Sequence, residues 1–301
     1  MQLRQLESFV SVCDTRHFTR SAQALRVAQP SLSQQIRSLE RDLGTQLFHR
    51  TRGNITLTDA GERLLPFARR ILSDAESARR EVQETVQLLR GRVRLGATPS
   101  LCASIVPDVL RRYHDRYPGI ELFVDEGGSR DLIRKLSDGV LDLALIITPS
   151  HGVVPSLATT QLLREELVVV SSPDQPPMSQ RQRLRITDLR HASLVMFRQG
   201  YDLREFTIAA CHDAGFEPRF TVEGGEMDAV LGYVRAGLGA AIVPSMVAKR
   251  SGLRVTHFVK PTMYRTIAVG HHKDAAPTRA ALELSAVLSE YMQNMQTSTA
   301  P

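Results

Sequence analysis

The 301-residue sequence has no long hydrophobic run and very little cysteine. No apolar stretch approaches the ~20 residues that a membrane-spanning helix needs, so we expect no membrane contact. The first residues contain Arg4 and Glu7 and lack an apolar core, which is not the pattern of a secretory signal. The spacing of Cys13, Cys102 and Cys211 fits neither a disulfide framework nor a metal site. We therefore expect a reduced protein of the cytoplasm.

The motifs of several enzyme classes are also missing. The nine histidines are scattered and form no H-E-x-x-H pair for zinc. No G-x-S-x-G nucleophile motif occurs. Gly237-Leu238-Gly239 lacks the third glycine of a dinucleotide-binding fingerprint and is typical of a turn between a helix and a strand. We therefore expect no enzymatic activity, no cofactor and no metal. The alternative is an enzyme or a solute-binding protein built on a two-lobed fold.

The positive charge is concentrated in the first third of the chain. Residues 1–90 hold 14 Arg, no Lys and 10 acidic residues, a net charge of +4. Residues 91–301 hold 24 basic and 22 acidic residues, a net charge of +2. A basic N-terminal module fits contact with phosphates. The preference for Arg over Lys is explained by genome composition at least as well as by phosphate contact.

Three short helices and a two-stranded wing are predicted in the first sixty residues. Apolar residues at helical spacing predict helices over 3–14 and 19–25. Pro30 suits the first turn of a third helix, which is expected to end at Gly44. Short apolar runs on either side of a basic turn then predict the wing, and Thr58 is placed to cap the helix that follows.

The polar face of the third predicted helix points to contact with DNA. The major groove admits one α-helix, and Gln and Arg side chains can bond adenine and guanine edges there. Arginines on the wing suit phosphate or the minor groove. A solvated polar face of an enzyme is the alternative interpretation. The candidate DNA-binding residues are Gln29, Pro30, Ser31, Ser33, Gln34, Arg37, Arg50 and Arg52.

The helix predicted over 59–90 carries small and apolar residues at alternating steps of four and three, which is a heptad pattern. A helix of this length has too little apolar surface to be stable alone. We expect it to pair with a second chain, and packing on its own globular domain is the alternative. The heptad stripe consists of Leu64, Ala68, Ile71, Ala75, Ala78, Val82, Thr85 and Leu89.

From residue 91 onward strands and helices alternate, which predicts an α/β domain with a mainly parallel sheet. A second alternating set begins with a strand expected at 167–170, so two lobes fit better than one. The predicted limits are 1–58 for the winged domain, 59–90 for the linker helix and 91–301 for the α/β domain, with lobe 1 at about 91–162 and 267–301 and lobe 2 at about 163–266.

The cleft between two such lobes is a natural ligand site, because it lies at the carboxyl ends of the strands. Thr98 and Ser100 follow the first strand at a predicted helix start, where N–H groups and hydroxyls suit an anion. Arg198 is the candidate partner of a carboxylate, or else a surface arginine. Cys102, if exposed as a thiolate, is a candidate oxidant sensor, whereas Cys211 is expected in the core.

Several segments of the sequence resemble the LysR-type transcriptional regulators. The resemblance is specific over residues 1–61 and looser beyond. It is carried by Phe18-Thr19-Arg20-Ser21-Ala22-Gln23-Ala24-Leu25, Val27-Ala28-Gln29-Pro30-Ser31-Leu32-Ser33-Gln34-Gln35-Ile36, Leu39-Glu40, Leu43-Gly44, Leu47-Phe48-His49-Arg50 and Leu57-Thr58-Asp59-Ala60-Gly61, and later by Asp142-Leu143-Ala144-Leu145-Ile146 and Gly237-Leu238-Gly239-Ala240-Ala241-Ile242-Val243-Pro244.

The resemblance implies an N-terminal α-helical winged helix-turn-helix, a long linker helix that dimerises, and a two-lobed effector domain like the type 2 periplasmic binding proteins. It implies a homodimer or homotetramer that binds and bends double-stranded promoter DNA, responds to a small-molecule effector and changes contact with RNA polymerase. It places Ser100, Ser129 and Thr148 along one wall of the cleft and the loop with Arg198 and Tyr201 along the other.

Two residues depart from the pattern of this family. Ala28 stands where the family often has Ser, so a helix cap worth ~1 kcal/mol is expected to be missing. Gln34 stands where Arg is frequent, which weakens the expectation of a guanine contact there. The resemblance still places Gln29, Pro30 and Ser33 at the DNA, together with Gln34 and Arg52.

Overall fold

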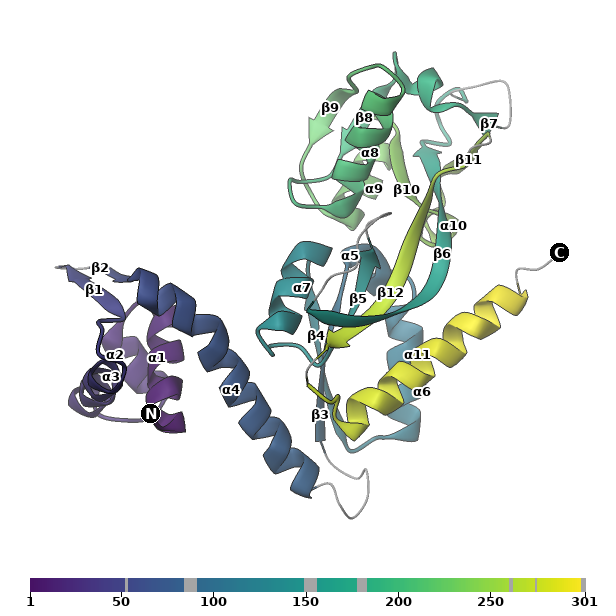
Figure 1. The fold of residues 1–301 in the computed structure, drawn as a ribbon. Helices are drawn as coiled ribbons and strands as arrows, with labels where there is room; N and C mark the ends of the chain where they lie inside the picture. Colours follow the sequence, from purple (N-terminus) through teal and green to yellow (C-terminus); the bar gives the residue numbers. More distant parts are fainter. Residues whose placement is uncertain are drawn as a thin grey trace. The chain divides into compact units, whose positions relative to one another are not determined.

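The computed structural model describes residues 1–51, 54–83, 91–148, 156–177, 183–259, 262–273 and 275–298. The chain divides into two compact units. The first comprises residues 1–87 with 135–140, and the second comprises residues 88–134 with 141–301. Figure 1 traces the elements of both units along the sequence.

The first unit contains the three helices and the wing that the sequence predicts. The core joins α1, α2 and α3 to the wing and α4 through residues such as Phe9, Ile36 and Phe48, which are all buried. The two wing strands pair antiparallel, with Phe48 opposite Leu57. The elements are α1 (Leu3–Thr15), α2 (Phe18–Ala24), α3 (Gln29–Leu43), β1 (Phe48–Thr51), β2 (Asn54–Leu57) and α4 (Asp59–Gln83).

The ends of these helices follow the predicted capping chemistry. Gly44 ends α3 with a φ of 69°, a left-handed conformation that glycine adopts without strain. The Thr58 hydroxyl accepts a hydrogen bond from the Gly61 amide at 3.1 Å and so caps α4. Ala28 is the N-cap of α3 and makes no side-chain bond to the helix, which confirms that this cap is missing.

The predicted heptad stripe of α4 is used partly within its own domain. Leu64, Ala68 and Ile71 pack against the core of the first unit, which is what the alternative interpretation expected for this end of the helix. Ala78 is exposed. Residues 84–90 lie outside the described residues, and with them Thr85 and Leu89, as does the side chain of Val82.

The second unit contains the predicted two lobes, each with its own hydrophobic core. The core of lobe 1 includes Val93, Tyr113 and Leu284, and that of lobe 2 includes Val168 and Val230. Two long strands, β6 and β12, run from one lobe to the other (Figure 1). The main sheet has the strand order β4-β3-β5-β12-β6-β11-β7, with β10 also paired to β6, and β8 and β9 form a separate pair.

The second unit begins with β3 and ends with α11. Its elements are β3 (Gly91–Ala97), α5 (Pro99–Cys102), α6 (Val106–Arg116), β4 (Ile120–Glu126), α7 (Ser129–Ser137), β5 (Leu143–Thr148), β6 (Leu157–Ser171), β7 (Arg183–Leu184), the 3-10 helix η2 (Ile186–Leu189), β8 (Ser193–Met196), α8 (Asp202–Asp213), β9 (Arg219–Glu223), α9 (Met227–Arg235), β10 (Ala241–Pro244), α10 (Ser245–Arg250), β11 (Arg254–Phe258), β12 (Tyr264–His272) and α11 (Arg279–Ser298).

Two expectations about this sheet were wrong in detail. The strand expected at 167–170 is the end of β6, which begins at Leu157, because its first half carries polar residues such as Thr159 and Gln161 that hide it. The sheet is parallel from β4 through β3 to β5 and again between β11 and β7, whereas β12 pairs antiparallel with both β5 and β6. The antiparallel part arises because the chain crosses to lobe 2 along β6 and returns along β12.

Candidate functional site

The outer face of α3 is polar and exposed, whereas its inner face is apolar. Leu32 and Leu39 are completely buried and fix the helix against α1 and the wing. Of the predicted DNA-binding residues on this helix, all but Ser33 are exposed. Ser33 is buried, and its hydroxyl accepts a hydrogen bond from Nε2 of the Gln29 side-chain amide at 3.0 Å. The exposed residues are Gln29, Pro30, Ser31, Gln34 and Arg37.

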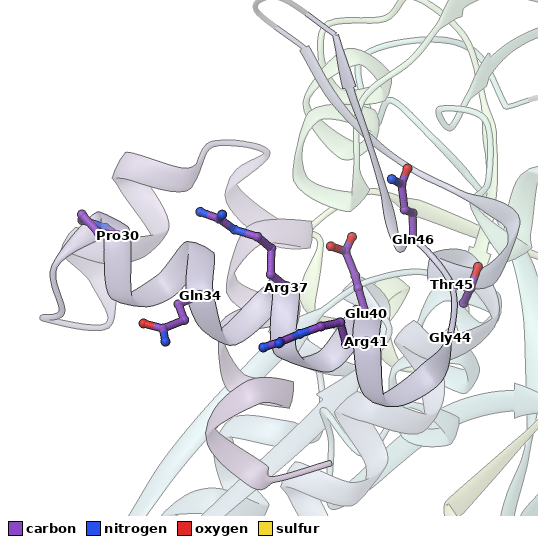
Figure 2. A pocket seen from close by; sticks show the side chains of 8 residues that line it. All are labelled: Pro30, Gln34, Arg37, Glu40, Arg41, Gly44, Thr45 and Gln46. Carbon is purple, nitrogen blue, oxygen red and sulfur yellow. The ribbon is translucent and has the colours of Figure 1, made fainter.

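A groove follows the exposed side of α3 into the loop after it. Figure 2 shows the side chains of Gln34, Arg37 and Arg41 extending away from the helix backbone. Glu40, the acidic residue that lines the groove, accepts a hydrogen bond from the Leu47 amide at 3.0 Å and so braces the loop. The groove is lined by Pro30, Gln34, Arg37, Glu40, Arg41, Gly44, Thr45 and Gln46.

The two strands of the wing come directly after the loop that lines this groove. His49 lies opposite Thr56 and Arg50 lies opposite Ile55, so the two strands of the predicted wing form an antiparallel hairpin. Arg52 lies outside the described residues, and so does the side chain of Arg50. Their roles at DNA therefore rest on the sequence alone.

Ser100, a predicted effector-site residue, belongs to a buried polar cluster in the second unit. Its hydroxyl accepts a hydrogen bond from Nη1 of Arg265 at 2.7 Å. Nη2 of the same guanidinium lies 2.7 Å from Oε2 of Glu165, and both of these side chains are 2% exposed. The Thr98 hydroxyl lies 3.3 Å from that of Ser100. Two of the predicted residues thus meet an ion pair that sequence reasoning did not find.

A weak signal for this ion pair is present in the sequence. Glu165 lies on the same face of β6 as Leu163 and Leu167, and Arg265 lies on the same face of β12 as Ile267. The two-residue period of a strand thus places each charge on an apolar face. A buried charge needs a partner, so two opposite charges in such positions suggest one another. The pairing itself depends on a strand register that joins residues far apart in the sequence.

Ser129 and Tyr201 lie on facing elements of the two lobes. The Ser129 hydroxyl donates to the Asp202 carboxylate at 2.7 Å and accepts from the Ile147 amide at 3.0 Å. Burial raises the pKa of Asp202, and the bonds from Ser129 oppose that effect. Tyr201, next to Asp202, is 3% exposed and stacks on Phe197 with the ring centroids 4.6 Å apart. These bonds join the α7 end of lobe 1 to the α8 end of lobe 2.

The other two predicted effector residues are placed differently. The Thr148 hydroxyl, at the end of β5, donates to the carbonyl of Thr266 at 3.4 Å and is half-buried. Arg198 is exposed, and its Nε donates to the Glu226 carboxylate at 2.7 Å. The positive charge of Arg198 is therefore already compensated, so the geometry does not single it out as a carboxylate ligand.

The three cysteines are poorly suited to redox sensing. Burial, and then the neighbouring Glu126 carboxylate, raises the pKa of Cys102 to about 12. Burial likewise raises the pKa of Cys13 to about 12 and that of Cys211 to about 11. Cys211 is in the core of lobe 2, as the sequence predicts. Reactive thiols have lowered pKa values, so these side chains are protonated at neutral pH.

Among the residues that the structure describes, no group of three His, Cys, Asp or Glu side chains could hold a metal ion. None of the described helices has the length and hydrophobicity of a membrane-spanning helix.

Comparison with known proteins assigns both units. Residues 3–62 match the bacterial regulatory helix-turn-helix domain of the lysR family, and residues 87–293 match the LysR substrate-binding domain. The transcriptional dual regulator GltC of Bacillus subtilis is 32% identical over 89% of this chain and 90% of its own length. A probable hydrogen peroxide-inducible genes activator of Streptomyces viridosporus is 31% identical over 97% of this chain and 95% of its own length.

Solved structures share the whole architecture. A full-length OxyR variant from Pseudomonas aeruginosa matches with a TM-score of 0.74 and 25% identity, over 97% of this chain and 95% of that one. CbnR in complex with its target DNA matches with a TM-score of 0.69 over 98% of this chain and 99% of that one, and at 23% identity it shows the fold alone. Taken with the two domain matches, these similarities show that the chain belongs to the LysR family of transcriptional regulators.

Proposed function

We propose that this protein binds promoter DNA through α3 and adjusts that binding when a small molecule occupies the interlobe cleft. The observation that carries the proposal is the two-sided character of α3. Its inner face is locked into a hydrophobic core, and its outer face presents amide and guanidinium groups. A rigid helix with polar groups on one side is what readout of the major groove requires.

The exposed side chains suggest a division of labour at the DNA. Gln29 keeps one amide N–H and its carbonyl oxygen when the other N–H bonds Ser33, which is the donor and acceptor pair that adenine requires. Gln34 is equipped for the same contact. Arg37 and Arg41 suit phosphates or a guanine edge, and Arg50 and Arg52 of the wing suit the backbone or the minor groove.

A second copy of the chain completes this proposal. Phe67 is 64% exposed on α4, although it is large and apolar. A second α4 packed against this helix would cover Phe67 and Ala78 and place two α3 helices about one turn of DNA apart. We propose a homodimer or homotetramer built on this contact.

The α/β unit supplies the response. A ligand that binds one arrangement of the lobes better than another shifts the balance between them. Thr98, Ser100, Ser129, Thr148 and Tyr201 are the proposed contacts, with Arg198 at the edge. The output would be a changed DNA bend and a changed contact with RNA polymerase, in the cytoplasm where the promoter is, rather than chemical turnover of the ligand.

Footprinting tests this proposal directly. The full-length protein is mixed with DNA from upstream of its own gene, and protection from nuclease is mapped. We expect one protected region with two half-sites about one helical turn apart. Uniform protection along the fragment would contradict sequence-specific binding. Sedimentation of the same sample reports the oligomeric state, and a monomer would contradict the paired arrangement.

A further inference from the structure

Four carboxylates gather where the two lobes meet. Glu126 ends β4 of lobe 1, whereas Asp202 begins α8, and Glu226 and Asp228 lie at the start of α9, all in lobe 2. The Glu126 carboxyl lies within hydrogen-bonding reach of the Glu226 carboxyl. Burial raises the pKa of Glu126, and so do the neighbouring Glu226 carboxyl and the negative charge of Asp228. Carboxylates from both lobes therefore meet at this point.

The arginines around this cluster already have anionic partners among the described residues. Arg198 is bonded to Glu226 at 2.7 Å. Arg204 lies 2.8 Å from Glu223, and Arg265 lies 2.7 Å from the buried Glu165. These pairs leave Glu126 and Asp228 without a compensating cation in any ion pair of the described chain, and the charge of Arg265 reaches Asp202 only from beyond ion-pair distance. A carboxylate ligand would thus enter a region of like charge.

The hydroxyl of Tyr201 is the second feature that points to a ligand. Tyr201 is 3% exposed, and its hydroxyl has no hydrogen-bond partner among the residues that the structure describes. Burial raises the pKa of Tyr201, and the carboxylates of Glu226, Glu126 and Asp202 act in the same direction against the positive charge of Arg265, so the hydroxyl lies beside the acidic cluster. A buried hydroxyl without a partner is unfavourable, so a polar group that reaches it gains a bond that the empty protein lacks.

We infer that the effector of this cleft carries a cationic nitrogen, such as a protonated amine, held between Glu126 and Glu226 with the Tyr201 hydroxyl as a further hydrogen-bond partner. This inference rests on the proposed function, since it names the ligand class of the same cleft. An ammonium group would compensate the uncancelled charge and bridge the two lobes, so it would favour one lobe arrangement over others. A carboxylate of the same shape would be rejected by repulsion.

Matched probes of opposite charge test the inference on the full-length protein. The first set is putrescine, 1,4-butanediol and succinate, and the second is benzylamine, benzyl alcohol and benzoate. Each is added at about 10 mM and constant ionic strength while the melting temperature is recorded. We expect at least one amine to raise it by about 2 °C or more, and the neutral and anionic probes to leave it unchanged. Stabilisation by the carboxylates, or by none of the six probes, would overturn the inference.

Three variants locate the effect. We expect Glu126→Gln and Glu226→Gln each to reduce the amine-induced shift by half or more, whereas Glu121→Gln, on the same strand as Glu126, retains it. Tyr201→Phe should also reduce the shift without lowering the melting temperature of the free protein, because it removes only an unbonded hydroxyl. An amine shift that persists in all of these variants would overturn the site.

Promoter binding by the same variants separates this inference from the proposed function. Unchanged footprints with no amine response would overturn the ligand class alone. Absence of a footprint from the unmodified protein would overturn the proposed function itself.

Discussion

Arg265 on β12 and Glu165 on β6 face each other in register and form an ion pair that is almost completely shielded from water. Nε of Arg265 donates to Oε2 of Glu165 at 2.8 Å, and Oε1 of the same carboxylate accepts from the Met246 amide at 2.9 Å. Ser100 is the third partner. The two strands that connect the lobes are therefore joined by a buried charge pair beside the proposed effector site.

Removing one charge of this pair should be strongly destabilising. In Glu165→Gln, the Arg265 guanidinium loses its counter-charge at a site where its side chain is only 2% exposed, and we expect a loss of about 3–5 kcal/mol in the free energy of unfolding. Urea denaturation of the second unit followed by circular dichroism measures it. The double variant Glu165→Leu/Arg265→Met should recover most of the loss, because no buried charge is left unpaired. A loss below about 1 kcal/mol in the single variant would contradict the description of this pair.

The missing cap of α3 offers a stabilising substitution. Ala28→Ser places a hydroxyl where it can accept from the Ser31 amide, since Pro30 has no amide hydrogen to donate. We expect about 1 kcal/mol of local stabilisation, seen as roughly fivefold slower hydrogen exchange in the first turns of α3. Ala24→Ser, at the end of α2, is the matched control and should not slow exchange in α3. Equal exchange in the Ala28 variant and the unmodified protein would count against the cap.

Arg37 should contribute to DNA affinity without regard to sequence. If it contacts phosphate, Arg37→Ala weakens binding to all duplexes by a similar factor and lowers the slope of log K against log salt by about 1. Fluorescence anisotropy over a salt series measures both quantities. Arg111→Ala removes an equally exposed arginine from α6 and is the control. A salt slope that is the same in both variants would remove Arg37 from the interface.

Gln29 should act on sequence preference instead. If it pairs with one adenine, Gln29→Ala costs about 1–3 kcal/mol on the preferred site and relaxes selection at a single base position. Binding to a set of duplexes with every base substituted at each position gives the preference profile. An unchanged profile, or a loss spread evenly over all positions, would exclude this contact.

The thiols should be inert under native conditions. With a pKa of about 12, Cys102 has a thiolate fraction on the order of one in ten thousand at pH 8, and the fraction rises as the pH approaches that value. We expect slow labelling by a thiol reagent, fast labelling in denaturant, and unchanged DNA binding after peroxide. Rapid labelling of native Cys102 would contradict its burial.

The sequence predicts the first unit almost completely because its signals are local. Helical spacing, Pro30 at the start of α3 and Gly44 at its end are features of a single segment, and each is found where it was expected. The strand ends that build the cleft were also predictable from the alternation of strands and helices. The long strand β6 was not, because polar residues interrupt its apolar pattern.

The chemistry of the cleft could not be obtained in this way. Whether Arg265 is a surface arginine or a buried partner of Glu165 depends on strand register across about a hundred residues of sequence. Arg198 stands out in the sequence because it lies in a loop, yet the fold pairs it with Glu226. Local patterns thus predict which strand ends and loops come together, whereas long-range pairing decides which charges meet there.

The affinity of the full-length protein for two duplexes in the same buffer tests the central claim most directly. One duplex carries the footprinted sequence, and the other carries the same bases in scrambled order. We expect the footprinted duplex to bind at least a thousandfold more tightly at physiological salt. Equal affinity for the two duplexes would contradict readout of the bases by α3.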